Sequence, residues 1–372
     1  MWWLLLWWAV YGYVLWRWRP HTASTEASEQ GGNEEGYHGP QVSILIPARN
    51  ERECLPEVLA ALKREASWVS EVIVIDDHST DGTAEVVREW REEVPFSLRC
   101  LRNEGAGKKA ALLTGIRGCR GEVIVTMDAD TIPEPGALEA LIRPFRRASV
   151  QMSAAYVRFW DEKAYERGML DKRFLLAFQA LEMAGFLALT EGSWQRGEPI
   201  TVNGAFLAYR KQAFEAVGGW GDAPHPGGDD ELLMQRLYER YGAEALVFSG
   251  AVAQTRPALS WQTFWHQRRR WLSKQRYYLF FWTRAGLALL GLTHLLFWLI
   301  GLISPSWALA HLCVTGALQA WVIGAGLQKL RLPSFLRFWY PLAQVWYPVY
   351  VVILGIMLWR GGFWWRGRWY EG

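Results

Sequence analysis

Short apolar runs alternate with stretches of helical periodicity between Gln41 and Thr255. The runs are rich in Val and Ile, and in the stretches between them apolar residues recur about every three or four positions. This alternation is typical of βαβ units, so we predict an α/β domain over residues 41–255 with a mainly parallel central sheet. The expected strands are 42–46, 71–75, 97–101 and 122–127, and the expected helices are 53–63, 83–92, 110–117 and 135–145.

The segment before this domain is apolar and ends at Arg17 and Arg19. It is short for a membrane span, which needs about 20 residues, but Trp and Arg can extend it through the interface. A signal peptide is the alternative, although no basic residue precedes the apolar run and no small-x-small cleavage site follows. We predict an uncleaved anchor over 1–19, with both arginines cytoplasmic, and a flexible polar linker over 20–40.

The part after the domain consists of a basic segment followed by a largely apolar one. Residues 256–284 predict an interfacial helix region, and residues 285–372 predict a membrane region. The runs 285–303 and 306–327 lack charged residues and form a predicted hairpin. The run 338–359 contains two prolines and fits either a span or a re-entrant segment. A span would place the basic tail outside, against the positive-inside rule.

A further periodic stretch lies within the domain, from Asp161 to Leu189. Leu170, Phe174 and Phe178 recur there at helical spacing. This pattern fits a core helix as well as an amphipathic helix on the bilayer surface, and the sequence leaves both open.

Composition supports the membrane interpretation. The 372 residues include 24 Trp, gathered mainly in the two apolar ends, and Trp favours the membrane–water interface. The formal net charge of +3 is too small to indicate a nucleic-acid partner. The four cysteines show neither metal-type nor disulfide-type spacing, which is typical of a reducing compartment and predicts a cytoplasmic central domain.

Two predicted strands end in paired carboxylates, at Asp76–Asp77 and at Asp128 and Asp130. In open α/β sheets the ligand crevice lies at this end of the strands, and side chains two residues apart point to the same side. The alternative is that these aspartates cap turns, and we favour that role for Asp76. Two such sites together predict a divalent metal that holds phosphates, since Mg²⁺ and Mn²⁺ prefer oxygen ligands.

An ordered set of motifs extends this interpretation: Val42–Glu51, Val74–Thr83, Gly107–Lys108, Asp128–Thr131, Asn203–Ala205, Gly218–Gly219, Asp229–Asp230 and Gln267–Trp271. Together they resemble the membrane-integrated branch of the family 2 glycosyltransferases, over residues 41 to about 271. Each motif alone is weak, but their order and spacing are specific. The resemblance implies a GT-A nucleotide-sugar fold, a divalent cation (Mg²⁺ or Mn²⁺) and inversion at the anomeric carbon.

The resemblance also implies roles for single residues on the donor side. Asp130 would ligate the metal, and Asp128 would lie near the nucleotide ribose or the metal. Asp77 would contact the uracil ring, which implies a UDP-sugar donor. Lys108 matches a family lysine near the nucleotide, with a solvated lysine as the alternative.

The loop after the first strand, with Pro47, Arg49 and Glu51, would flank the base or ribose. An exposed loop arginine is an equal alternative for Arg49.

Asp230 is the predicted general base, because inversion needs one carboxylate to take a proton from the acceptor hydroxyl. The family pair implied by the resemblance is Glu-Asp, and here Asp229 replaces the glutamate on the acceptor side. The alternative is that both residues cap a helix, which is compatible with the catalytic role.

Gln267, Arg270 and Trp271 match the Gln-x-x-Arg-Trp pattern of the family. An arginine can bind diphosphate oxygens bidentately, and an indole face can stack on an acceptor. The alternative is a basic interfacial helix that binds anionic lipid headgroups, a role we expect of Arg268 and Arg269.

These observations favour a membrane-bound transferase that moves one sugar to a lipid-like acceptor. The chain is short for a processive polysaccharide synthase, which is the first alternative; an inactive binding or scaffold protein is the second. The segment Trp365–Tyr370 resembles the Trp-x-Gly-Arg tail of bacterial enzymes similar to carotenoid glucosyltransferases. That resemblance implies a polyisoprenoid or carotenoid acceptor.

Overall fold

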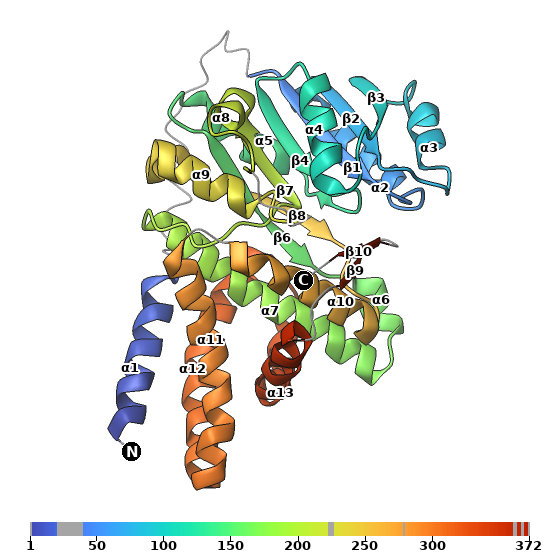
Figure 1. The fold of residues 1–372 in the computed structure, drawn as a ribbon. Coiled ribbons are helices and arrows are strands. Elements are labelled where there is room, and N and C mark those ends of the chain that lie inside the picture. Colours follow the sequence, from blue (N-terminus) through green and yellow to red (C-terminus); the bar gives the residue numbers. More distant parts are fainter. Residues whose placement is uncertain are drawn as a thin grey trace. The chain divides into compact units, whose positions relative to one another are not determined.

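The computed structural model describes residues 2–20, 40–221, 227–277, 280–359, 363–365 and 368–370. They belong to two compact units (Figure 1). The sheet unit comprises residues 22–158 and 201–256, and the helical unit comprises residues 1–21, 159–200 and 257–372. The predicted linker lies almost wholly outside the described residues.

The parallel half of the sheet unit matches the predicted strands closely. Its strands follow the order β3-β2-β1-β4, and their Val and Ile side chains are buried, as expected for strands covered on both faces. The strands are β1 (Val42–Ala48), β2 (Glu71–Asp76), β3 (Ser97–Arg102) and β4 (Val123–Met127). The helices that flank them are α2 (Leu55–Arg64), α3 (Thr83–Trp90), α4 (Lys108–Gly118) and α5 (Ala137–Ile142) (Figure 1).

The other half of the sheet extends beyond β4 in the order β7-β6-β8-β5. Here β7 runs antiparallel to both β4 and β6, and β5 runs antiparallel to β8. These elements are β5 (Ile132–Pro133), β6 (Met152–Phe159), β7 (Phe206–Arg210) and β8 (Leu246–Thr255), with helices α8 (Lys211–Ala216) and α9 (Glu231–Tyr241). The predicted α/β fold class with a GT-A-type sheet is confirmed, as is the set of apolar helices at both ends of the chain.

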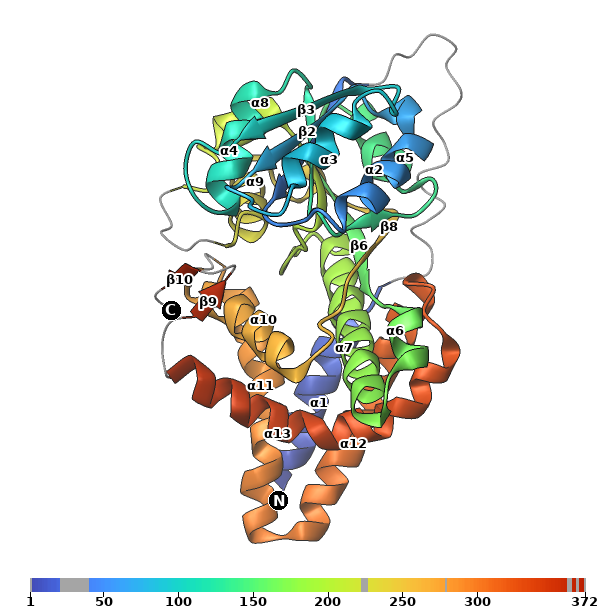
Figure 2. The same cartoon turned by 90° about the vertical axis from the view of Figure 1, so that its right-hand side faces the viewer.

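The helical unit consists mainly of long helices. They are α1 (Trp2–Arg17), α6 (Glu162–Arg167), α7 (Leu170–Gln195), α10 (Trp261–Ser273), α11 (Phe281–Ile303), α12 (Pro305–Lys329) and α13 (Tyr340–Trp359). Two short strands, β9 (Phe363–Trp365) and β10 (Arg368–Tyr370), pair in antiparallel orientation near the end of the chain. Helices α1, α11 and α12 run side by side, whereas α13 lies across them (Figures 1 and 2).

Helix α7 is a core helix of its unit, so the alternative of a surface helix on the bilayer is wrong. Phe178 and Leu181 are fully buried. A Cβ added to Gly326 of α12 would lie 1.9 Å from the carbonyl oxygen of Ala184, so only glycine permits this approach of α12 to α7. Small residues at such a crossing allow close backbone packing.

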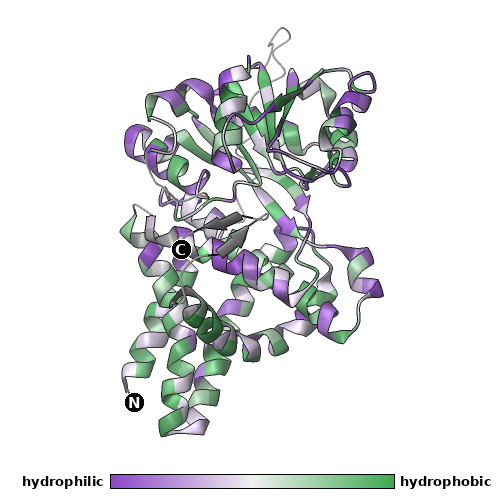
Figure 3. Ribbon diagram, turned by 45° about the vertical axis from the view of Figure 1, so that its right-hand side comes forward, coloured by the Kyte–Doolittle hydropathy of each residue, from purple (hydrophilic) through white to green (hydrophobic). Residues whose placement is uncertain are grey.

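Four described helices are long and apolar enough to cross a membrane: Leu170–Gln195, Thr283–Ile303, Pro305–Lys329 and Ser334–Met357. The first is largely enclosed by protein, whereas few residues of the second are buried. Apolar residues cover α11 and α12 along their length (Figure 3). The predicted hairpin is present, with α12 beginning at Pro305 directly after Ser304.

Candidate active site

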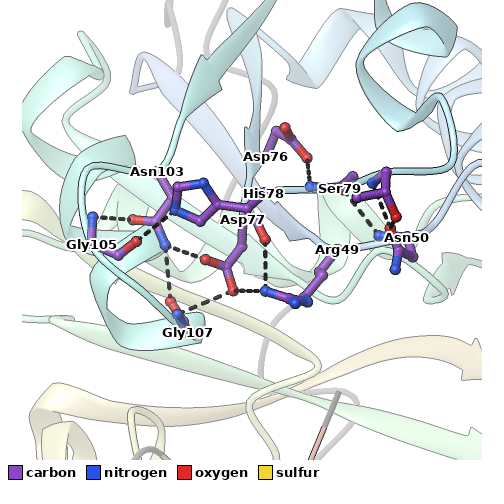
Figure 4. A network of polar contacts seen from close by, with 10 residues as sticks. Arg49, Asn50, Asp76, Asp77, His78, Ser79, Asn103, Gly105 and Gly107 are labelled. Carbon is purple, nitrogen blue, oxygen red and sulfur yellow. Dashed lines mark hydrogen bonds and ion pairs between the residues drawn. The ribbon is translucent and has the colours of Figure 1, made fainter. Parts of the chain in front are cut away.

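Asp77 organises three loops at the carboxyl edge of the parallel strands (Figure 4). It directly follows β2 and is buried. Its carboxylate accepts hydrogen bonds from Asn103 Nδ2 at 2.7 Å and from the Gly107 backbone at 3.1 Å. Arg49 donates to the Asp77 carbonyl at 3.2 Å and lies 3.8 Å from its carboxylate. Arg49 is therefore not an exposed loop arginine, and the loops after β1, β2 and β3 form one network.

Asn103 is a member of this network that the sequence analysis missed. It follows β3, and it is buried. The rule that ligand crevices lie at the carboxyl ends of parallel strands would have identified it. Asp76 has the predicted turn role, since its carboxylate accepts from the Ser79 backbone at 3.0 Å.

The first strand–helix loop is held by backbone contacts. Pro47 is half-buried within β1. Glu51 is buried, and its backbone donates to the Thr83 hydroxyl at 2.9 Å. Asn50 between them has a φ of 55° and donates to Ser79 Oγ at 3.0 Å. The loop is thus anchored to the turn after β2.

Lys108 connects three segments that are distant in the sequence. It opens α4, and its Nζ lies 2.8 Å from Asp128 Oδ1, 3.3 Å from Asp229 Oδ2 and 3.5 Å from the Gly204 carbonyl. With only 16% of its side chain exposed, it is not a solvated lysine. Burial acts to lower the pKa of Lys108, but the two carboxylates outweigh it and raise the pKa above its usual value.

Asp230 is fixed at the N-terminus of α9. Its Oδ1 accepts from the Glu231 backbone at 2.8 Å and its Oδ2 accepts from the Gly204 backbone at 3.0 Å. The predicted capping role is therefore present. A Cβ on Gly204 would lie 2.7 Å from Asp230 Cβ, so this contact requires glycine.

Asp128 and Asp130 follow β4 and are both half-buried. The Asp128 backbone is held by the Ala205 carbonyl at 3.1 Å. Among the described residues, no group of three or more His, Cys, Asp or Glu side chains could enclose a metal. Mg²⁺ and related ions often bind through one or two carboxylates together with water and substrate phosphates. The aspartate pair fits a cation shared with a diphosphate and does not fit a closed structural metal site.

The Gln-x-x-Arg-Trp residues lie on α10, in the helical unit. Gln267 Oε1 accepts from Arg268 Nη1 at 2.7 Å, and the Trp271 ring packs edge-on against Phe159 at 5.7 Å. Arg270 is half-buried on the same helix.

The expectation that Arg268 binds lipid headgroups is wrong, because its side chain points into the protein. Arg268 is only 3% exposed and forms an ion pair with Glu182 of α7. Glu182 also accepts a hydrogen bond from the Tyr350 hydroxyl. The sequence analysis identified neither Glu182 nor Tyr350.

The four cysteines do not pair with one another. All four are free thiols, in agreement with their irregular spacing. Burial, with a contribution from Glu51, raises the pKa of Cys54 to about 12. This raised pKa favours the protonated thiol near neutral pH.

Replacement of Lys108 by Met should destabilise the sheet unit. Asp128 and Asp229 would lose the Lys108 ammonium group with which both form ion pairs. We therefore expect the free energy of unfolding to fall by about 2 kcal/mol. The pKa of Lys108 is raised in the folded protein, whereas that of a lysine in the unfolded chain is about 10.4. The stabilisation is therefore complete below about pH 10.4, which includes the neutral range, and it is lost only as the pH rises through the higher pKa of the folded state. Thermal unfolding with and without Mn²⁺ tests this, because a bound cation should partly offset the loss.

The matched control is Lys63→Met. Lys63 forms an exposed ion pair with Glu93 at 3.8 Å, so its loss should cost less than about 1 kcal/mol. Equal destabilisation by both variants would contradict the bridging role of Lys108.

The fold is of the GT-A type, with a mixed, mostly parallel sheet and apolar helices. Residues 43–218 match the family model described as glycosyl transferase family 2. This part of the protein is a glycosyltransferase family 2 domain, in agreement with the resemblance inferred from the motifs.

Curated relatives share the same region. The chain is 30% identical over 244 residues to the probable glycosyltransferase YdaM of Bacillus subtilis (strain 168), covering 64% of the chain and 56% of the relative. It is 29% identical over 245 residues to the beta-monoglucosyldiacylglycerol synthase of Nostoc sp. (strain PCC 7120), covering 62% and 48%. The chain thus spans about half the length of these relatives.

One solved structure resembles nearly the whole chain. It is the mannosyltransferase PcManGT from Pyrobaculum calidifontis in complex with GDP-Man and Mn²⁺, with 19% identity, a TM-score of 0.57 and 95% of each chain covered. At this identity the likeness concerns the fold, and it includes helices of both units.

Proposed function

We propose that the protein is a membrane-bound, cation-dependent, inverting glycosyltransferase that moves one sugar from a UDP-sugar to a lipid-like acceptor, such as a polyisoprenoid or carotenoid. The observation that carries the proposal is the Lys108 bridge, which joins Asp128 of the metal motif to Asp229 beside the predicted base Asp230. Lys108, Asp128 and Asp229 all belong to the sheet unit, which supports assigning the leaving-group and acceptor roles to neighbouring residues there.

On the donor side, Asp130 and Asp128 would hold the divalent cation. When bound, this cation neutralises negative charge that develops on the leaving diphosphate. Lys108 adds a fixed positive charge at the same place. Asp77 is buried at the carboxyl end of β2, where its carboxylate accepts from Asn103 and Gly107, and this position supports a role as acceptor for the N3–H of uracil.

On the acceptor side, Asp230 would remove the proton. The acceptor hydroxyl oxygen forms a bond to the anomeric carbon while the bond from that carbon to the diphosphate oxygen breaks. The hydroxyl proton passes to Asp230, and the nucleoside diphosphate leaves with the bonding electron pair. The two backbone amides of Gly204 and Glu231 keep the carboxylate in one orientation for this transfer.

From the family resemblance alone, Gln267 and Arg270 would bind the diphosphate and Trp271 would bind the acceptor. Its apolar helices support a membrane location and a lipid-like acceptor, and the Nostoc relative carries diacylglycerol in its name. The position of α13 across α11 and α12 supports an interfacial or re-entrant segment over 338–359, which would keep the C-terminal tail on the cytoplasmic side.

The test is turnover by the purified full chain in lipid vesicles with Mn²⁺ or Mg²⁺. We expect release of UDP from a UDP-sugar that depends on added polyisoprenoid, carotenoid or diacylglycerol, and a product carrying one sugar by mass spectrometry. Long sugar polymers would instead favour a processive synthase. Turnover of GDP-mannose alone would overturn the uridine assignment, and the absence of turnover with every donor would overturn the proposed activity.

A further inference from the structure

Two arginines of the helical unit lie over exposed indole rings. The Arg19 Cζ is 4.2 Å from the centroid of the Trp321 ring of α12. The Arg196 Cζ, directly after α7, is 5.6 Å from the centroid of the Trp16 ring of α1. The two tryptophans are 38% and 55% exposed, respectively. A guanidinium over an aromatic face loses freedom of movement and keeps its N–H groups at the edge of its plane.

Both arginines belong to one junction between the end of α1 and the end of α7. A Cβ added to Gly192 of α7 would lie 1.8 Å from the carbonyl oxygen of Trp18, so only glycine permits this approach. Arg19 directly follows Trp18, and Arg196 lies about one helical turn after Gly192. The two arginine side chains therefore start from the same small region, in which the backbones are in contact.

Two carboxylates at this junction already have cationic partners. Arg17 Nε donates to Glu198 Oε2 at 3.2 Å, and Arg17 Nη2 binds the other oxygen. The hydrogen bonding from Arg17 lowers the pKa of Glu198, and Arg196 adds to this effect from a longer distance. Glu191 of α7 pairs with Lys329 of α12 at 3.0 Å. Each carboxylate is thus neutralised by a cation of its own.

Arg19 and Arg196, in contrast, carry charge that the junction does not neutralise. Within the described part of the chain neither forms an ion pair, and the Nε of each is buried without a hydrogen-bond partner. A half-buried cation without a counter-charge is costly, so the junction favours an anion supplied from outside the chain. Arginine binds phosphate oxygens through two parallel N–H···O bonds, which makes phosphate a well-matched anion.

We propose that Arg19 and Arg196 bind the phosphate of an anionic membrane lipid. Exposed Trp rings are typical of the membrane–water interface, where lipid headgroups lie, and Trp16 and Trp321 put both guanidinium groups at that level. Helix α1 also exposes large apolar side chains between Trp2 and Val10, which the acyl chains of a lipid can cover. A lipid therefore fits this junction better than free phosphate does. The site is independent of glycosyl transfer.

The test is lipid retention by the full chain in detergent micelles, followed by native mass spectrometry as lipid is added. Phosphatidylglycerol carries a net negative charge, whereas choline neutralises the phosphate of phosphatidylcholine. Since a hydrogen bond to a charged group corresponds to roughly ten- to hundredfold in affinity, we expect one phosphatidylglycerol to bind about tenfold more tightly than phosphatidylcholine. Equal retention of the two lipids would overturn the proposal. Displacement of phosphatidylglycerol by an equal concentration of inorganic phosphate would overturn the choice of a lipid.

Two variants locate the site. Arg19→Gln and Arg196→Gln should each weaken phosphatidylglycerol binding about tenfold, because each removes one charged donor group. The matched control is Arg337→Gln, which removes an exposed arginine of the same unit and should leave the affinity unchanged. An equal loss in all three variants would indicate general attraction to positive charge and would contradict the site. If the variants fold poorly, the comparison of the two lipids on the wild type still decides. Loss of sugar transfer with normal phosphatidylglycerol binding would concern the proposed function alone.

Discussion

Asp230→Asn should abolish sugar transfer while leaving nucleotide binding intact. Asparagine has nearly the shape of aspartate and can still accept from the Gly204 backbone, but it cannot take a proton from the acceptor. General-base catalysis contributes roughly 10²- to 10⁴-fold, so we expect kcat to fall about a thousandfold. The measurement is UDP release under saturating donor and acceptor, together with calorimetric UDP affinity.

Glu239→Gln provides the control for charge loss on the same helix. Glu239 is an exposed residue of α9, and its replacement should leave kcat unchanged. If Asp230→Asn retained full activity, another group would have to accept the proton. Asp229, which pairs with Lys108, would then be the next residue to test.

Asp130→Asn should produce the second large effect, through loss of the cation. Removing one of two carboxylates weakens binding of a hard divalent ion, and stabilisation of the leaving group by such an ion contributes several kcal/mol. We therefore expect turnover to fall at least about a hundredfold, with weaker Mn²⁺ binding measured by electron paramagnetic resonance.

The matched control for this site is Glu139→Gln. Glu139 is exposed on α5 and should affect neither Mn²⁺ affinity nor turnover. Unchanged Mn²⁺ binding by Asp130→Asn would exclude the residue as a ligand.

The parallel half of the fold was predictable because β2 and β4 are Val- and Ile-rich runs that end at aspartates. The strands β5 to β8 were not predicted, because segments such as Phe206–Arg210 are short and combine aromatic, small and charged residues. Their place in the sheet depends on pairing with distant strands, which periodicity within one segment does not report.

The charged residues of the site were predictable by type, but their partners were not. Lys108 follows a glycine, which indicated a loop, whereas its bridge to Asp229 joins residues more than a hundred positions apart. Arg268 was predicted to lie at the membrane surface, but it is buried. The sequence does not distinguish three consecutive arginines, and only tertiary packing shows which of them forms an ion pair with Glu182.

The path of the chain limits how a soluble fragment of this protein could be prepared. The chain passes between the two units four times, and α7 belongs to the helical unit although it interrupts the sequence of the sheet unit. A fragment that stops at Arg256 would keep α7 but remove α12. The backbone around Ala184 would then lose its contact with Gly326 of α12. A water-soluble fragment of the sheet unit therefore also requires excision of residues 159–200 and a linker in their place.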